Sequence, residues 1–213
     1  MGYPKFAHSA IISGETMSGK TEFVLDLLEK EYLYFFEYIV IICPNWSSNK
    51  AYLNRAWVTN NPDQVFMVDP EEWFPKSDDQ FQTAIKVFYE VIGKMTDGQV
   101  LFLIDDSIAE EGIDKKRSAL IKLACSGRHD NCSLWVLSQA YVAVPKTIRR
   151  QVKWLTTFWC KDENDFDVIM KENNVVPISE RQKLNKNLEK KQYSKLILFL
   201  HPPRGHKFVV NKR

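Results

Sequence analysis

The residues best suited to chemistry begin at Gly14, from which the chain reads GETMSGKT to Thr21. This spacing fits the pattern GxxxxGK[ST], whose glycines let successive backbone N–H groups point at phosphate oxygens. An apolar run precedes the segment and a helical pattern follows it, which places a helix N-terminus beside the bound anion. We therefore expect a phosphate-binding loop made of Gly14, Glu15, Thr16, Met17, Ser18, Gly19, Lys20 and Thr21.

Two side chains of this loop have distinct expected roles. The Lys20 ammonium should reach the β and γ phosphates of a nucleoside triphosphate, and the Thr21 hydroxyl should bind Mg²⁺. Such a site also needs a strand that ends in an acid, and residues 100–106 read VLFLIDD. A carboxylate at a sheet end costs desolvation unless it has a partner, so packing alone explains this pattern poorly. Asp105 is expected to bind the Mg²⁺, and Asp106 to orient and polarise the attacking water.

A third polar residue follows an apolar run at Gln139. The run SLWVLS at 133–138 predicts a strand that ends at Ser138 and Gln139. Ligands of open α/β sheets bind at the carboxyl ends of the strands, where Gln139 would sense the γ phosphate or position water. A solvated turn residue is an equally good interpretation of this glutamine.

The elements that must position these residues are short apolar runs that alternate with helical patterns. This alternation predicts an α/β fold with a mainly parallel central sheet and helices on both faces. No repeat or linker divides the chain, so residues 1–213 are expected to form a single domain. The predicted strands are 6–12, 38–43, 65–68, 100–105, 133–138, 154–159 and 195–200.

Three helices have sequence signals of their own. Apolar residues at steps of three and four predict a helix over 79–95, which buries Phe81, Ile85, Phe88, Ile92 and Met95. Asp69 and Pro70 have the types expected at a helix start. Ser179 and Gln182 have the spacing of a capping box before a basic helix that runs through Lys190 and Lys191.

The motifs SGETMSGKT, VLFLIDDS and ACSGRHDNCSLWVLSQAYVAVPKTIRRQ together carry a family resemblance. The chain resembles the genome-packaging ATPases of poxviruses and related large DNA viruses, virophages and archaeal viruses, a branch of the FtsK–HerA superfamily. The resemblance covers residues 7 to about 160 and rests on four motifs in order. They include the GRH element at 127–129 and the Pro-x-x-Ile-Arg element at 145–149.

The resemblance implies a P-loop fold of the additional-strand type, in which the Gln139 strand lies between the two nucleotide-binding strands. It also implies a Mg²⁺-dependent ATPase that works as an oligomeric ring and moves double-stranded DNA into a preformed capsid. Lys20, Thr21, Asp105, Asp106 and Gln139 match the family's phosphate, magnesium, water-activating and sensing positions. Asp106 departs from the wider superfamily, which often has Glu there, but the shorter acid can still orient water.

Ring ATPases of this kind use an arginine from a neighbouring subunit to stabilise transition-state charge. Arg149 and Arg128 both lie in suitable motifs, and Arg150 beside Arg149 prevents an assignment by spacing. For each of these arginines, a salt bridge or a plain surface charge is the alternative.

The net charge of +2 hides a marked asymmetry. Residues 1–145 carry 13 basic and 20 acidic side chains, whereas residues 146–213 carry 16 basic and 7 acidic ones. A polyanion should therefore prefer the basic C-terminal portion. The candidate DNA contacts, each of which is otherwise a solvated surface charge, are Lys115, Lys116, Arg117, Lys183, Lys186, Lys190 and Lys191.

Other functional classes make different demands on the sequence. A GTPase is disfavoured because no NKxD-type tetrapeptide follows the later strands. A small nucleotide kinase or a non-motor regulatory ATPase remains an alternative, whereas a pure nucleic-acid-binding module leaves Lys20, Asp105 and Asp106 unexplained. A zinc site at Cys125, His129 and Cys132 lacks a fourth ligand and the usual spacing.

Location and redox state follow from composition. The four cysteines show no secreted framework, so reduced thiols are expected. No run approaches the roughly 18 apolar residues of a membrane span. We expect a soluble protein without a membrane partner, associated with virions or located in the host cytoplasm or viral factory, whose partners include a capsid or portal vertex.

Overall fold

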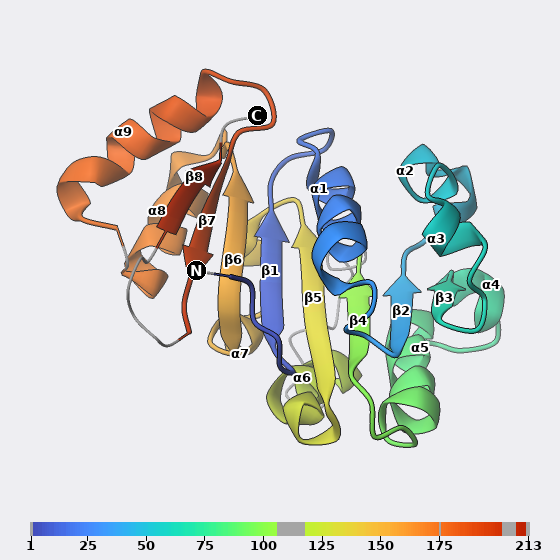
Figure 1. The fold of residues 1–213 in the computed structure, drawn as a ribbon. Coiled ribbons are helices and arrows are strands. Elements are labelled where there is room, and N and C mark those ends of the chain that lie inside the picture. The colour runs from blue at the N-terminus through green and yellow to red at the C-terminus, as the bar shows by residue number, and fades with distance from the viewer. Residues whose placement is uncertain (1, 106–117, 175, 202–207, 212–213) are drawn as a thin grey trace.

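A computed structural model describes residues 2–105, 118–174, 176–201 and 208–211 of the chain (Figure 1). Its described strands form one sheet in the order β3-β2-β4-β5-β1-β6-β7-β8. From β3 to β6 all neighbours are parallel, whereas β7 is antiparallel to β6 and β8 is antiparallel to β7. The strands are β1 Ser9–Ser13, β2 Tyr38–Ile42, β3 Val65–Val68, β4 Val100–Ile104, β5 Cys132–Ser138, β6 Val152–Phe158, β7 Lys195–Phe199 and β8 Phe208–Asn211.

The helices of the described residues connect these strands. They are α1 Lys20–Leu27, α2 Lys50–Leu53, α3 Ala56–Thr59, α4 Pro70–Trp73, α5 Gln80–Phe88, α6 Ala119–Ser126, α7 Lys146–Arg149, α8 Glu163–Asn173 and α9 Ile178–Glu189. The π-helical turns Leu28–Tyr32 and Tyr89–Gly93 extend α1 and α5. Short 3₁₀ turns cover Trp46–Ser48, Gly127–Asp130 and Tyr141–Ala143.

Helices cover both faces of the sheet, which explains why its strands read as unbroken apolar runs. Successive residues of β1 belong to different cores: Ile11 packs with α5, α6 and α8, whereas Ala10 and Ile12 pack with α1, α2 and α3. All five residues of β4 are fully buried. The predicted α/β architecture with helices on both faces is therefore confirmed.

All seven predicted strands are present, with ends that differ by at most three residues. The strand β5 lies between β4 and β1, as the family resemblance implied. The strand β8 was not predicted. Asp69 accepts a hydrogen bond from the Glu71 amide at the start of α4, as expected of a helix cap.

Two helix details of the sequence interpretation are wrong. Met95 is 80% exposed, because the helical turn after α5 ends at Gly93 and the side chain two residues later leaves the buried stripe. Ser179 is not an N-cap, because α9 already begins at Ile178 after Pro177. The basic helix itself is present, but it ends at Glu189, with Lys190 as its C-cap and Lys191 beyond it.

The four cysteines are free thiols, and Cys43, Cys132 and Cys160 are buried. Within the described ranges, no three His, Cys, Asp or Glu side chains gather as a metal site. No helix in those ranges has both the length and the apolar character needed to cross a bilayer.

A buried histidine, His8, links the two central strands β5 and β6 through their tryptophan side chains. The indole N–H groups of Trp135 on β5 and Trp154 on β6 both donate to Nε2 of His8, over 2.9 and 3.0 Å. An indole can only donate, so Nε2 is unprotonated and Nδ1 carries the proton, which it donates to the Phe6 carbonyl. Burial lowers the pKa of His8 to about 4.

Because His8 is buried in its neutral form, we expect the free energy of unfolding to fall in acid. Unfolded His8 binds a proton below pH 6.5, but the folded protein resists protonation until about pH 4, so stability is full above pH 6.5 and declines as the pH falls toward 4. The loss should amount to about 3 kcal/mol in the free energy of unfolding. Urea denaturation of the wild type and His8→Asn at pH 7 and pH 4.5 measures it.

The variant should be less stable at pH 7 but lose less stability on acidification. His129→Asn, at an exposed position, is the matched control and should keep the wild-type pH profile. Equal acid losses in the wild type and His8→Asn would contradict the assignment.

Candidate nucleotide-binding site

The loop that follows β1 is fixed to the neighbouring strand and has no spare room at its first glycine. The Gly14 amide donates to the Ser138 carbonyl at the end of β5, over 3.1 Å. A Cβ at Gly14 would lie 2.8 Å from both Cβ of Phe158 and Oγ of Ser18. Gly19 has a φ of 91°, in the left-handed region that favours glycine, and α1 begins at the next residue. Both positions of the sequence motif therefore require glycine, Gly14 because a side chain would clash and Gly19 because of its backbone conformation.

Lys20 points into the loop. Its side chain is 6% exposed, and Nζ donates to the carbonyls of Gly14 and Glu15 over 2.7 and 2.9 Å. The ammonium group thus lies inside the curve of the loop, where a phosphate held by the backbone N–H groups would meet it. A pocket of about 690 Å³ opens beside it, lined among others by Lys20, Thr21, Phe23, Asp105, Tyr193 and Lys195.

The end of β4 brings a buried carboxylate to this pocket. Asp105 is 2% exposed, and its backbone amide donates to the Ile42 carbonyl of β2. The hydroxyls of Thr21 and Tyr52 both donate to Oδ2 of Asp105, over 3.1 and 2.6 Å. A hydroxyl and a carboxylate in direct contact suit Mg²⁺, which prefers oxygen ligands and keeps several waters. Thr21 and Asp105 therefore fit the metal role expected of them.

Gln139 follows β5 directly and is exposed at the same sheet edge, between the ends of β4 and β1. The turn after it is held by Asp165 of α8, which is 5% exposed and whose carboxylate accepts from the backbone amides of Tyr141 and Val142, each over 2.9 Å. The direction in which the chain leaves β5 is thus fixed by a carboxylate from a later helix.

Arg128 and Arg149 lie at the opposite end of the parallel strands from the phosphate loop. Arg128 lies in the 3₁₀ turn Gly127–Asp130 before β5, and Arg149 lies at the end of α7 before β6. Both strands run parallel to β1, so the two arginines sit near the starts of these strands, whereas the phosphate loop follows the end of β1 (Figure 1). Arg128 is exposed. Arg149 is 11% exposed, pairs with Glu172 over 3.0 Å and lies 4.9 Å from the centre of the Tyr141 ring. Neither arginine is positioned to serve the nucleotide site of its own chain.

The remaining predicted residues fall into two groups. Asp106, Lys115, Lys116 and Arg117 lie outside the described residues. Lys183, Lys186, Lys190 and Lys191 are exposed on α9 or just after it.

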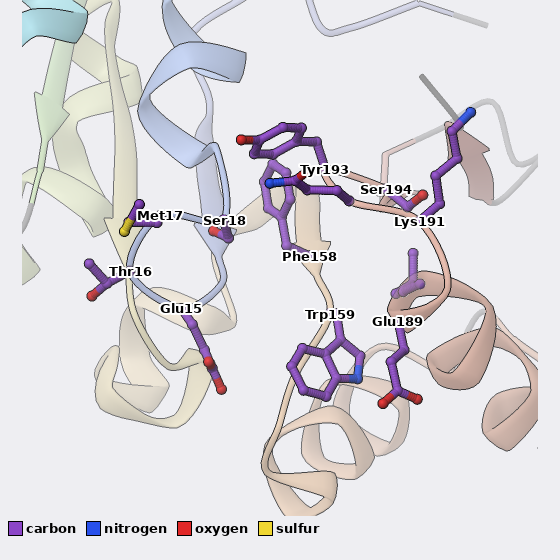
Figure 2. A pocket seen from close by; sticks show the side chains of 12 residues that line it. Glu15, Thr16, Met17, Ser18, Phe158, Trp159, Glu189, Lys191, Tyr193 and Ser194 are labelled. Atoms are coloured by element: carbon purple, nitrogen blue, oxygen red, sulfur yellow. The ribbon is translucent and has the colours of Figure 1, made fainter.

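The connection after α9 returns to the phosphate loop (Figure 2). A smaller pocket of about 180 Å³ is lined by loop residues 15–18, by residues 188–189 and 191–194, and by Phe158 and Trp159. Tyr193 has a φ of 63°, and its ring lies against Gly19, where an added Cβ would be 3.0 Å from Cδ1. Sequence reasoning missed the contributions of Tyr52, Asp165, Tyr193 and Lys195, because none belongs to a recognisable motif.

Comparison with known proteins places these features in context. The family described as Poxvirus A32 protein matches residues 5–198. No curated protein matches the sequence. Among solved structures, the chain is similar to the genome packaging NTPase B204 from Sulfolobus turreted icosahedral virus 2 in complex with AMPPCP. That match has a TM-score of 0.64 and 15% identity, and it covers 99% of both chains.

Two further structures share the fold. B204, the DNA-packaging ATPase from Sulfolobus turreted icosahedral virus, matches with a TM-score of 0.63 and 17% identity over 98% of both chains. The conjugation coupling protein TcpA of pCW3 matches with a TM-score of 0.56 and 14% identity, over 98% of this chain and 60% of that one.

The contact between Tyr52 and Asp105 leads to a test without any nucleotide. A hydrogen bond to a charged group contributes about 1.5–3 kcal/mol, so Tyr52→Phe should lower the free energy of unfolding by about 2 kcal/mol in metal-free buffer. Urea denaturation of the single and double variants with Asp105→Asn measures the coupling.

The Tyr52→Phe penalty should shrink by at least half in the Asp105→Asn background, because the acceptor is then neutral. Tyr34→Phe, at a position that is 99% exposed, is the matched control and should change nothing. An identical Tyr52→Phe penalty in both backgrounds would show that the hydroxyl does not stabilise the charge.

Proposed function

Because the chain belongs to the Poxvirus A32 protein family, we propose that it is a Mg²⁺-dependent ATPase that moves double-stranded viral DNA into a preformed capsid. The observation that carries the proposal is the site at the ends of β1 and β4, where Lys20 lies inside the phosphate loop and Thr21 contacts Asp105. The fold shared with the B204 packaging ATPase supports it.

The proposed chemistry assigns a task to each group at this edge. Backbone N–H groups of the loop and the Lys20 ammonium bind the β and γ phosphates of ATP. Thr21 and Asp105 hold Mg²⁺, which neutralises charge that develops on the phosphates. Gln139 positions the attacking water or senses the γ phosphate from the end of β5. Asp106, next to Asp105 in sequence, orients and polarises that water.

The position of the arginines favours an assembly. A cation that stabilises the transition state must approach the γ phosphate, yet Arg128 and Arg149 lie at the edge opposite their own phosphate loop. In a head-to-tail ring, two different surfaces of the subunit meet at each interface, and we propose that the surface carrying the arginines meets the nucleotide site of the next subunit. Arg128 is exposed, whereas Arg149 is held by Glu172, so we propose Arg128 as the arginine that acts on the neighbouring site.

DNA contacts are proposed on the basic C-terminal portion. Lys183, Lys186, Lys190 and Lys191 are exposed on or after α9, which follows the site-forming strands in sequence. A packaging motor must hold any sequence, so these lysines contact backbone phosphates rather than bases. The capsid or portal vertex is the second partner, and the virion or viral factory is the place of action.

ATP turnover with and without long duplex DNA tests the proposal. Duplex DNA should raise the rate, and Lys20→Ala should lower the rate by about 100-fold or more, because one charge-stabilising donor is lost. Lys161→Ala removes an exposed lysine that is not among the candidate contacts and should leave both rates unchanged. If duplex DNA left the rate of ATP turnover unchanged and the protein phosphorylated a nucleoside monophosphate, the protein would be a kinase instead.

Mixing inactive subunits tests the proposed role of Arg128. Arg128→Ala alone should lower turnover about 1,000-fold or more. Mixing it with Lys20→Ala should restore part of the activity, because an Arg128→Ala site then receives the intact arginine of a Lys20→Ala neighbour. The same mixture made with Arg149→Ala should show no such rescue. If activity were restored only in the mixture of Arg149→Ala with Lys20→Ala, Arg149 would be the arginine that acts on the neighbouring site.

A further inference from the structure

A second buried lysine lies in the nucleotide pocket and has no part in the chemistry described above. Lys195, the first residue of β7, is 4% exposed. Its Nζ lies 4.8 Å from the ring centre of Phe23 and 5.7 Å from that of Phe158. It lines the same 690 Å³ pocket as Lys20, Thr21 and Asp105.

Burial of an ammonium group is costly, and lysine is among the residues least often found inside proteins. Aromatic faces offset part of this cost by cation–π attraction. Phe23 lies two residues after Thr21 on α1, and Phe158 packs against Gly14, so both rings belong to the immediate surroundings of the phosphate loop. The rings thus hold a positive charge at the wall of a pocket whose backbone already suits an anion.

The strand order determines which part of a nucleotide Lys195 meets. Asp105 reaches the pocket from β4, on one side of β1, whereas Lys195 reaches it from β7, on the other side. Lys195 pairs in register with Phe158, the last residue of β6, at the edge where the phosphate loop lies. Thr21 and Asp105 mark the end of the pocket that takes Mg²⁺ and the γ phosphate. The phosphate that faces Lys195 is therefore the one farthest from that end.

We propose that Lys195 is a second lysine ligand of the nucleotide and binds the α phosphate, while Lys20 binds the β and γ phosphates. The inference rests on the proposed nucleotide site and adds a contact from the C-terminal portion of the chain. The ring of Tyr193, two residues earlier, lies against Gly19. Tyr193 and Lys195 therefore both line the nucleotide pocket.

Nucleoside monophosphate binding separates the two lysines. AMP has only the α phosphate, so Lys195→Met should weaken AMP binding about tenfold or more, whereas Lys20→Met should leave AMP binding nearly unchanged. Both variants should weaken ATP binding. Titration calorimetry or fluorescence competition without Mg²⁺ measures the dissociation constants, and Lys161→Met at an exposed position outside the proposed contacts controls for the loss of one positive charge.

The variants also distinguish failure of this inference from failure of the proposed function. If the wild type binds neither AMP nor ATP, the nucleotide site itself is wrong. If the wild type binds both and Lys195→Met binds them equally well, only the role of Lys195 is overturned. Methionine keeps the apolar stem against Phe23 and Phe158, and Lys195→Arg keeps the charge and should retain AMP affinity to within a few-fold.

A measurement on the wild type covers the case in which Lys195→Met does not fold. Carbon-13 labelling of lysine allows the side-chain Cε signal of Lys195 to be followed by NMR and assigned with Lys195→Arg. Saturating AMP should shift this signal more than that of Lys186. An unshifted Lys195 signal at saturating AMP would overturn the proposal.

Discussion

The charge of Asp105 is buried at the end of β4, where a carboxylate is stable only when donors or a cation surround it. The neighbouring elements supply those donors. Thr21 at the start of α1 and Tyr52 in α2 both direct hydroxyls at one carboxylate oxygen. The helix that carries the phosphate loop and the crossover between β2 and β3 are thus both tied to a single negative charge. Neither can shift without changing the solvation of that charge.

The order of the strands brings the other residues of the nucleotide site close to Asp105. The neighbours β4, β5 and β1 end side by side, and their ends carry Asp105, Gln139 and the phosphate loop. The Gly14 amide is bonded to the last carbonyl of β5, and Asp165 holds the turn that follows. Chain segments that are far apart in sequence are therefore held together by a backbone hydrogen bond at Gly14 and by a buried carboxylate at Asp165.

Local patterns explain which features could be predicted from the sequence. The strands other than β8 were predictable because their apolar residues are buried on both faces of the sheet. The phosphate loop was predictable because steric contact at Gly14 and a left-handed backbone at Gly19 require glycine. Tyr52 carries no such signal, since its partner is 53 residues away and a buried tyrosine is otherwise an ordinary core residue. Lys195 was predicted only as the first residue of the strand 195–200, and the proximity of its ammonium to the rings of Phe23 and Phe158 depends on the arrangement of the sheet.

The antiparallel direction of β7 determines how the C-terminal portion is attached. A seventh parallel strand would have to start at the edge far from the phosphate loop, and α9 would then deliver its chain to that far edge. With the direction reversed, the chain leaves α9, passes the phosphate loop and only then enters the sheet. The segment between α9 and β7 therefore passes beside the nucleotide pocket, which Tyr193 and Lys195 line, so only a few residues separate the basic helix from that pocket.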